Sequence, residues 1–243
     1  MSLLKHTWDK ILPNNCTICG KTPDADGRIP YPVPEDFHIC FKCLSSLVPQ
    51  PSDRRFFLCL SEPYKGDPYP SLGLYMPFPY KGFFETAVPK MKFRSCPQIA
   101  EFAGMLLGTF MHKDGVNASL IVPVPLSEKR LKERGYNQAQ LIAYEASGIC
   151  NIPFSNDVLV RTRDTQRQTE LETGMVRSAN VEGAFKVSSA YDVTGLKVIV
   201  VDDVATTGFT LHEAASELYK AGAAEVFCCA VCGNRAVLNA ESF

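Results

Sequence analysis

The sequence predicts an α/β protein in which a small N-terminal module with four cysteines precedes a mostly parallel, doubly wound sheet. From about residue 90, strands that are apolar on both faces alternate with segments of helical spacing, which is typical of parallel sheets covered on both sides. Before residue 90 the chain carries 13 of its 17 prolines, which favour short strands, turns and loops. We therefore expect a cysteine module in residues 1–60, a proline-rich connector in 61–89 and the α/β domain in 90–243.

The elements of the α/β domain can be placed in order. A helix is predicted from Pro97 to Phe110, where apolar residues recur every three or four positions. The segment Ser119–Leu126 is typical of a buried strand that runs into a loop. After it we expect a long helix from Ser127 to about Gly148. The remaining expectations are strands at Asp157–Val160, Gly183–Val187, Leu196–Val201 and Glu225–Val231, with a helix at Thr210–Ala221 that Gly222 closes.

The bulk composition narrows the class of protein. The chain has 243 residues, is 46% hydrophobic and carries a formal charge of −1, so it has ample material for a core and is not a wholly basic nucleic-acid binder. It contains no apolar run of about 18 residues, the length of a membrane span. Its first residues lack the pattern of a secretory signal, so we expect a cytoplasmic protein. Ten cysteines in such a protein indicate metal ligands and buried thiols rather than disulfides.

Four of the cysteines have the spacing of a metal site. Two C-x2-C pairs are separated by twenty residues, and Gly20 follows the first pair at the point where a tight turn is needed; the four ligands are Cys16, Cys19, Cys40 and Cys43. Four thiolates complete a tetrahedral shell around zinc and leave no open position, so a structural zinc ion is expected. Cys229 and Cys232 share the spacing but lie in a predicted strand, where we expect core packing.

The stretch VIVVDDVATTGFT, residues 198–210, predicts a ligand site. Asp202 and Asp203 follow an apolar strand, and ligands of open parallel sheets lie beyond the carboxyl ends of the strands. A glycine-containing turn at the start of a helix presents amide donors to an anion, and threonine hydroxyls add to them. The acids repel phosphate, but they can accept hydrogen bonds from sugar hydroxyls or hold a bridging cation. A ribose 5-phosphate unit satisfies both halves of the pattern.

Two other interpretations of this stretch were weighed. An apolar strand that ends in aspartate also occurs in P-loop NTPases, but Gly20–Thr22 is the chain's only Gly-Lys-Thr and Asn15 stands where the first glycine should be. A buried strand followed by a helix-capping turn explains Thr206 or Thr207 as a cap. It does not explain two adjacent acids before three threonines and a glycine.

The stretch closely resembles the 5-phosphoribosyl-1-pyrophosphate (PRPP) motif of type I phosphoribosyltransferases, with Ala205 smaller than the usual aliphatic residue. The resemblance implies that Asp202 and Asp203 contact the ribose hydroxyls. It further implies, with Mg²⁺ accompanying PRPP, that the 5-phosphate lies against the loop Ala205, Thr206, Thr207, Gly208, Phe209 and Thr210.

Two further segments, Val122–Ala143 and Arg161–Phe185, together with the cysteine pairs, make the whole chain resemble the ComF family of competence proteins. That family joins a zinc-binding module to a phosphoribosyltransferase-like domain. The resemblance implies a role in natural transformation and DNA uptake, with PRPP, single-stranded DNA and a competence helicase of the ComFA kind as partners.

A second loop is expected at the same end of the sheet as Asp202. In phosphoribosyltransferases such a loop lies against the pyrophosphate, which places Pro125, Leu126 and Ser127 there. Arg130 and Arg134 are one helical turn apart, so both can face one anion. Glu128 and Glu133 stand among these arginines, so a helix face that points into solvent is the other interpretation that stays open.

A long polar connection follows the strand at Asp157–Val160. Connections of this length are usually lids or binding loops, and the resemblance places here the flexible loop that closes over PRPP. Its polar residues are Arg161, Arg163, Thr165, Arg167, Gln168 and Arg177. Together with Lys90, Lys92 and Arg94 beside Phe93 they could form a track for single-stranded DNA, or serve only solubility.

Three functions from different classes stay open from the sequence. The first is a ComF-like protein that binds PRPP and handles DNA. The second is a phosphoribosyltransferase that acts on a small base or amine, for which no acceptor signature and no general base is visible. The third is a binding module that retains the phosphate site for sensing.

Overall fold

The computed structural model describes residues 15–22, 34, 37–60, 71–93, 96–162, 183–234 and 240–242. The described strands form a seven-stranded sheet in the order β4-β7-β8-β2-β1-β9, with β3 also paired to β8. The strands are β1 (Phe56–Leu60), β2 (Ser71–Tyr75), β3 (Phe78–Pro79), β4 (Leu120–Pro123), β7 (Lys197–Ala205), β8 (Glu225–Gly233) and β9 (Ala240–Ser242). Pairing is parallel from β4 through β7 and β8 to β2, whereas β1 is antiparallel to β2 and β9. The mostly parallel sheet that the sequence predicts is confirmed.

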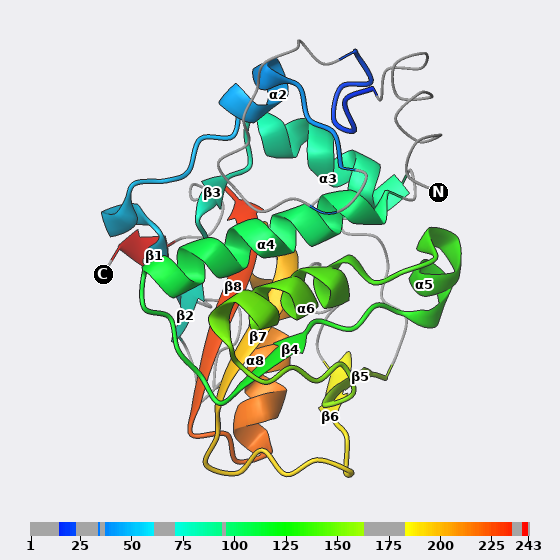
Figure 1. Cartoon of the computed structure of the whole chain (residues 1–243). Coiled ribbons are helices and arrows are strands. Elements are labelled where there is room, and N and C mark those ends of the chain that lie inside the picture. The colour runs from blue at the N-terminus through cyan, green and yellow to red at the C-terminus, as the bar shows by residue number, and fades with distance from the viewer. Residues whose placement is uncertain are drawn as a thin grey trace.

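Helices cover both faces of the sheet (Figure 1). On one face, α3 (Phe83–Phe93), α4 (Pro97–Lys113) and α6 (Gln138–Cys150) pack with Ile199 and Val201 of β7 in one core cluster. On the other, α8 (Phe209–Lys220) packs with Val198 and Val200 in a second cluster. The strand side chains alternate between the two clusters because successive residues of a strand point to opposite faces. This two-sided burial accounts for the unbroken apolar run in β7.

The helix expected from Ser127 to Gly148 is two helices, so that prediction was wrong. The first, α5, covers Glu128–Arg134, and α6 begins at Gln138. Gly135 adopts a left-handed conformation with φ 79° and ends α5, since its amide donates to the carbonyl of Leu131. Asn137 then caps α6, because its side-chain oxygen accepts a hydrogen bond from the amide of Ala139 at 3.1 Å. The break brings this turn back over the end of β4.

Two strands are longer than expected. We predicted Leu196–Val201, but β7 continues to Ala205, and β8 continues to Gly233 rather than Val231. The extra residues keep parallel pairing, with Asp202 opposite Ala230 and Ala205 opposite Gly233. Asp202 and Asp203 therefore lie within the last part of strand β7, not in a loop after it. The pairing skips Asp203, since Val204 is the next residue with a partner and lies opposite Cys232.

The span expected as a connector, residues 61–89, contains β2 and β3, which pair with β8 of the main sheet, and the start of α3. The segment before it is held by a buried ion pair. Arg55, 6% exposed, donates from Nη1 to both carboxylate oxygens of Asp114 at 2.9 and 2.8 Å. Tyr75 adds a hydrogen bond to Asp114 at 2.8 Å. The proline-rich region therefore shares the core of the α/β domain, which composition alone did not indicate.

The other two expected strands form a small sheet of their own, in which β5 (Leu159–Arg161) pairs antiparallel with β6 (Phe185–Val187). They flank the long polar connection, of which residues 163–182 lie outside the described residues. Among the helices that the structure describes, none combines the length and the apolar character needed to cross a bilayer.

Candidate functional site

Several predicted site residues meet at the carboxyl edge of the sheet. The strands β4 and β7 are parallel and in register from Leu120 opposite Val198 to Pro123 opposite Val201. The amide of Val124 continues this pairing with a hydrogen bond of 2.8 Å to the carbonyl of Val201. The loop Pro125–Ser127 and the acids of β7 therefore emerge side by side, as expected from parallel topology.

The acids of β7 are held in defined positions. Asp203 is buried, with 7% of its surface exposed, and its Oδ2 lies 2.9 Å from Nζ of Lys92 on α3. The amide of Asp203 donates to Oδ1 of Asp202 at 2.8 Å. The regular pairing of β7 with β8 is interrupted at Asp203, as in a bulge that redirects side chains near a site. Asp202 is only partly buried and is the more accessible acid.

The electrostatics of the pair are unequal. Burial, followed by the charge of Asp203, raises the pKa of Asp202 to about 7, although Lys92 acts against the rise. Burial acts to lower the pKa of Lys92, but the carboxylates of Asp203 and Asp202 outweigh it and raise the pKa above its usual value. Because two close carboxylates share one ammonium group, a further cation or hydroxyl donors would stabilise their charged forms.

The turn after β7 has the features of an anion site. Gly208, with φ 78°, is the N-cap of α8 and no side chain caps that helix. The capping interpretation of Thr206 or Thr207 is therefore wrong. Instead, Oγ1 of Thr207 is buried and, within the part of the chain that the structure describes, has no hydrogen-bond partner. A buried hydroxyl without a partner is costly unless a ligand satisfies it.

The predicted phosphate-loop residues divide between three elements. Ala205 is the last residue of β7 and is buried, Thr206 to Gly208 form the turn, and Phe209 and Thr210 begin α8. The amides of a first helical turn point along the axis toward the turn. The residues that the sequence singled out are thus contiguous around one helix entrance, which carries the positive end of a dipole.

Of the two arginines of α5, Arg134 is within electrostatic range of the acids. Ser127 caps α5 by accepting from the amide of Arg130 at 3.4 Å. Arg134 donates to Oε1 of Gln138 at 2.9 Å and stands 5.6 Å over the ring of Phe93. Burial lowers the pKa of Arg134, Arg130 adds to this, and Asp203 and Asp202 oppose it. The charge of Arg134 therefore interacts with those of the acids, and Arg130 lies close enough to act on Arg134.

The expected flexible loop is described only at its ends. Arg161 donates from Nη1 to the carbonyl of Pro125 at 3.2 Å and lies 5.1 Å over the ring of Phe185. It therefore joins the Pro125–Ser127 loop to the β5–β6 sheet. The remaining residues of that prediction, Arg163, Thr165, Arg167, Gln168 and Arg177, lie outside the described residues.

Lys92 is the site residue that sequence reasoning misplaced, since it was grouped with a DNA track. It stands four residues after Val88 and eight after Phe84, both buried. A lysine on the apolar face of a helix is rarely buried without a partner. That spacing was the available signal, but only the fold shows that the partner is Asp203.

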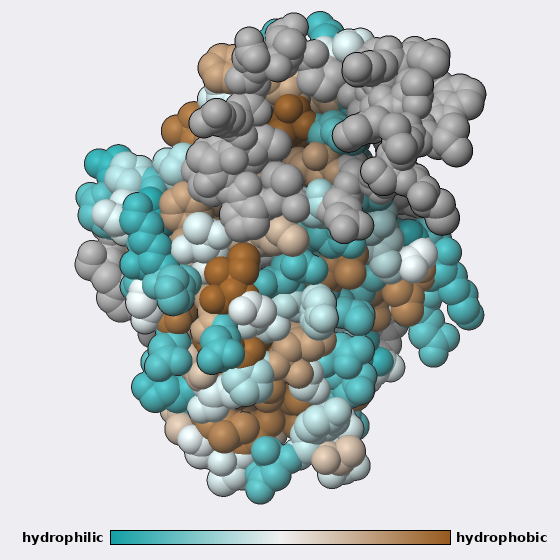
Figure 2. Space-filling view, in the orientation of Figure 1, coloured by the Kyte–Doolittle hydropathy of each residue, from teal (hydrophilic) through white to brown (hydrophobic). Residues whose placement is uncertain are grey.

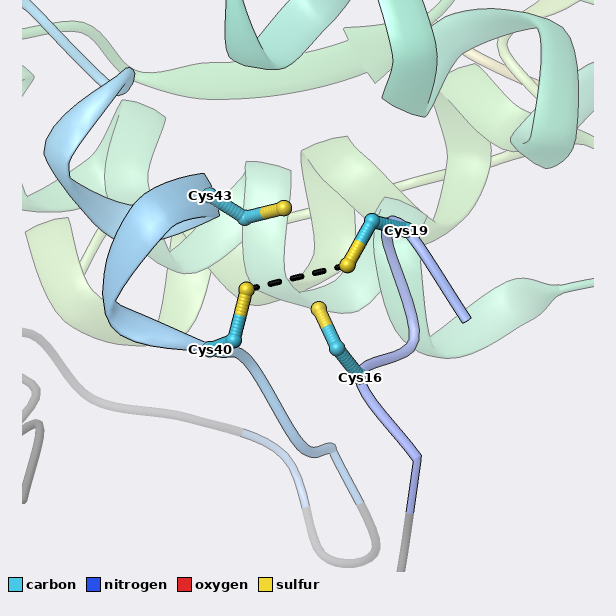
Figure 3. Close-up of side chains that lie close together, drawn as sticks. All are labelled: Cys16, Cys19, Cys40 and Cys43. Carbon is cyan, nitrogen blue, oxygen red and sulfur yellow. Dashed lines mark hydrogen bonds between the residues drawn. The ribbon is translucent and has the colours of Figure 1, made fainter. Parts of the chain in front are cut away.

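The four predicted cysteines come together near the N-terminus. Their Sγ atoms lie within 4.8 Å of one another and point to a common centre (Figure 3). The Sγ atoms of Cys19 and Cys40 are 3.7 Å apart, which matches the roughly 3.8 Å edge of a tetrahedron with zinc–sulfur bonds of about 2.3 Å. Gly20, with φ 74°, closes the first turn by donating to the carbonyl of Cys16 at 2.8 Å. The donor set and its spacing fit a zinc ion.

The thiols of this cluster differ in their surroundings. The amide of Lys21 lowers the pKa of Cys19 to about 7, against an opposing effect of burial. Burial raises the pKa of Cys40 and Cys43. A divalent ion bound at the centre would hold all four as thiolates.

The chain matches the family described as "Phosphoribosyl transferase domain" over residues 131–242. It is 38% identical over 107 residues to Competence protein F of Haemophilus influenzae, covering 44% of this chain and 46% of that protein. It is 37% identical over 106 residues to DNA utilization protein YhgH of Escherichia coli, covering 44% and 45%. Competence protein ComFC of Bacillus subtilis is 31% identical over 148 residues, or 60% and 58% of the two chains. The chain thus spans about half the length of these relatives.

Proposed function

Because the chain belongs to the ComF family, we propose that it binds PRPP, or a closely related phosphoribosyl ligand, at the carboxyl end of β7. Asp202 and Asp203 accept hydrogen bonds from the ribose hydroxyls, and the turn Thr206–Gly208 receives the 5-phosphate. Pro125 to Ser127, with Arg130 and Arg134, face the pyrophosphate. The neighbouring acids supply a place for the Mg²⁺ that accompanies such a ligand.

The observation that carries the proposal is the buried hydroxyl of Thr207. It has no hydrogen-bond partner among the described residues, and it lies in a turn that opens α8 next to two carboxylates. A phosphate at this helix entrance would accept from that hydroxyl and from amides of the first turn. As a helix cap the hydroxyl would have a partner within the turn, and here Gly208 takes the N-cap position instead.

Titration calorimetry with magnesium and PRPP tests the binding site. We expect the change of Asp202→Asn with Asp203→Asn to weaken binding by about 100-fold, since hydrogen bonds to charged groups are lost. Thr207→Val keeps the shape of the side chain and should weaken binding about tenfold. Asp157→Asn, at an exposed acid, is the control. Equal affinity of all four proteins would reject the site.

We further infer that the protein takes part in DNA uptake and handles single-stranded DNA. The relatives' names, competence protein and DNA utilization protein, support this role. An exposed aromatic ring adds support: Phe93 is 66% exposed and lies under the guanidinium of Arg134. Hydrophilic side chains gather at the edge where Figure 1 places α5, as Figure 2 shows. Bases stack on such rings while basic groups attract the backbone.

A second function, phosphoribosyl transfer to an acceptor, uses the same site. The exposed ring of Phe93, which lies under Arg134, is the feature that favours it, because an aromatic acceptor could stack there. Incubation with labelled PRPP, with and without an oligonucleotide, separates the two functions. Release of pyrophosphate indicates transfer, and binding without release indicates a ligand-binding role.

A further inference from the structure

We propose that Lys92 is a positioning residue for the ribose site, and that the cysteine turn, residues 16–21, holds it in place through helix α3. This inference rests on the proposed function, because the ribose contact it controls is that of Asp203. It assigns the N-terminal module a role in ligand binding, in addition to metal coordination.

The contact between Lys92 and Asp203 is short and sheltered. Nζ lies 2.9 Å from Oδ2, and the side chains are 24% and 8% exposed. Truncation of one partner of such a pair leaves the other charge buried and free to reorient. Without the ammonium group, Asp203 would lose both its orientation and part of the compensation for its charge. Lys92 does not need to touch the sugar in order to act, since it fixes the oxygen that does.

The other side of α3 is tied to the cysteine turn. Nζ of Lys90 donates to the carbonyl of Thr17 at 3.1 Å. Thr17 stands between Cys16 and Cys19, and its amide donates to the carbonyl of His38 at 2.7 Å. Residues two apart on a helix project about 200° from each other, so Lys90 reaches the module while Lys92 reaches the sheet. The same helical turn therefore contacts both sites.

The module and the helices share one core. Ile18 is 1% exposed and belongs to the cluster that contains α3 and α4. Phe37 stacks on Phe102 of α4, with ring centroids 4.6 Å apart. The last turn of α3 has a second support, because the carbonyl of Met91 accepts hydrogen bonds from Tyr136 and Gln138. We therefore expect loss of the Lys90 contact to weaken, not abolish, the placement of Lys92.

Calorimetry with magnesium and PRPP on the metal-loaded protein tests the role of Lys92. Lys92→Met should weaken binding at least about tenfold, the size expected for a lost hydrogen bond to a charged group, and Lys92→Arg should restore it to within about threefold. In an Asp203→Asn background, Lys92→Met should cause no further loss, because Lys92 acts through Asp203. Lys81→Met, at an exposed lysine just before α3, is the matched control. Losses that multiply, or a Lys92→Met affinity equal to that of the control, would overturn the proposal.

A second measurement needs no ligand. A double-mutant cycle on urea unfolding gives the coupling between Lys92 and Asp203, which we expect to be at least about fivefold in the unfolding constant. The same cycle in a Lys90→Met background should show a clearly smaller coupling, and PRPP affinity should fall about threefold. Coupling without PRPP binding would reject the proposed function and leave the link intact. PRPP binding with no coupling, or with coupling that Lys90→Met does not change, would reject the link alone.

Discussion

The close packing of α4 against α6 predicts a measurable effect on stability. On α4, a Cβ built at Gly104 would lie 2.6 Å from the carbonyl oxygen of Ile142 and 2.8 Å from its Cα, both backbone atoms of α6. Cβ of Glu145 would also lie at 2.8 Å. These distances are far inside van der Waals contact, and backbone atoms cannot rotate away. Gly104→Ala must therefore push the two helices apart.

The magnitude follows from two opposing effects. Alanine gains about 1 kcal/mol of helix propensity over glycine, whereas overpacking in a close-packed core costs about 1–3 kcal/mol. Because three contacts are violated at once, we place the cost at the upper end and expect a net loss of about 1–2 kcal/mol. For a chain of this length that lowers Tm by roughly 2–8 °C.

The matched control is Gly148→Ala on α6. Gly148 is exposed and a Cβ there would meet nothing within 4 Å, so this variant should gain up to about 1 kcal/mol from propensity. Urea unfolding and thermal scans of both variants measure the difference. If Gly104→Ala is as stable as Gly148→Ala, the helices do not cross as closely as described, and the reasoning fails.

The remaining predictions concern charge and metal. Burial and the charge of Asp203 raise the pKa of Asp202 to about 7, so this group holds a proton in the folded state that the unfolded chain releases near pH 4. The ligand-free protein should therefore lose stability as the pH rises from about 4 to about 7. In Asp202→Asn this loss of stability with rising pH should vanish. A profile of Tm against pH that is the same in the variant and the wild type would contradict the assignment to Asp202. Metal analysis should find about one zinc per chain, and Cys16→Ser should lose it; a folded, metal-free wild type rejects the site. Binding of a single-stranded oligonucleotide should weaken with salt, with a smaller salt slope after Arg163→Gln and Arg167→Gln; a salt-independent signal counts against an electrostatic track.

Local patterns were sufficient for most of the elements after residue 96 and for the two clusters. Each C-x2-C pair is local, and the turn at Gly20 brings Cys16 and Cys19 together. The segment around Asp202 could be placed at a sheet edge because an apolar run, two acids and a glycine turn follow each other directly. These features depend on a few residues that are close in sequence.

What the sequence did not show depends on long-range contacts. Lys92 and Asp203 are far apart in the chain, and nothing near Lys92 states which group its ammonium would meet. The proline-rich span joins the sheet because β8 offers an edge for β2 and β3, a fact that proline content hides. The break at Gly135 was missed because the helical spacing continues across it, while the left-handed cap and Asn137 end one helix and begin the next.

The central claim is that the turn after β7 binds the phosphate of a phosphorylated pentose whose hydroxyls meet the acids of that strand. A crystal structure of the protein soaked with ribose 5-phosphate and magnesium tests it most directly. The account predicts phosphate density within hydrogen-bond distance of the Thr207 hydroxyl and the first amides of α8, with the sugar beside Asp202 and Asp203. Saturating ligand that leaves this turn empty, or that binds elsewhere on the molecule, would contradict it.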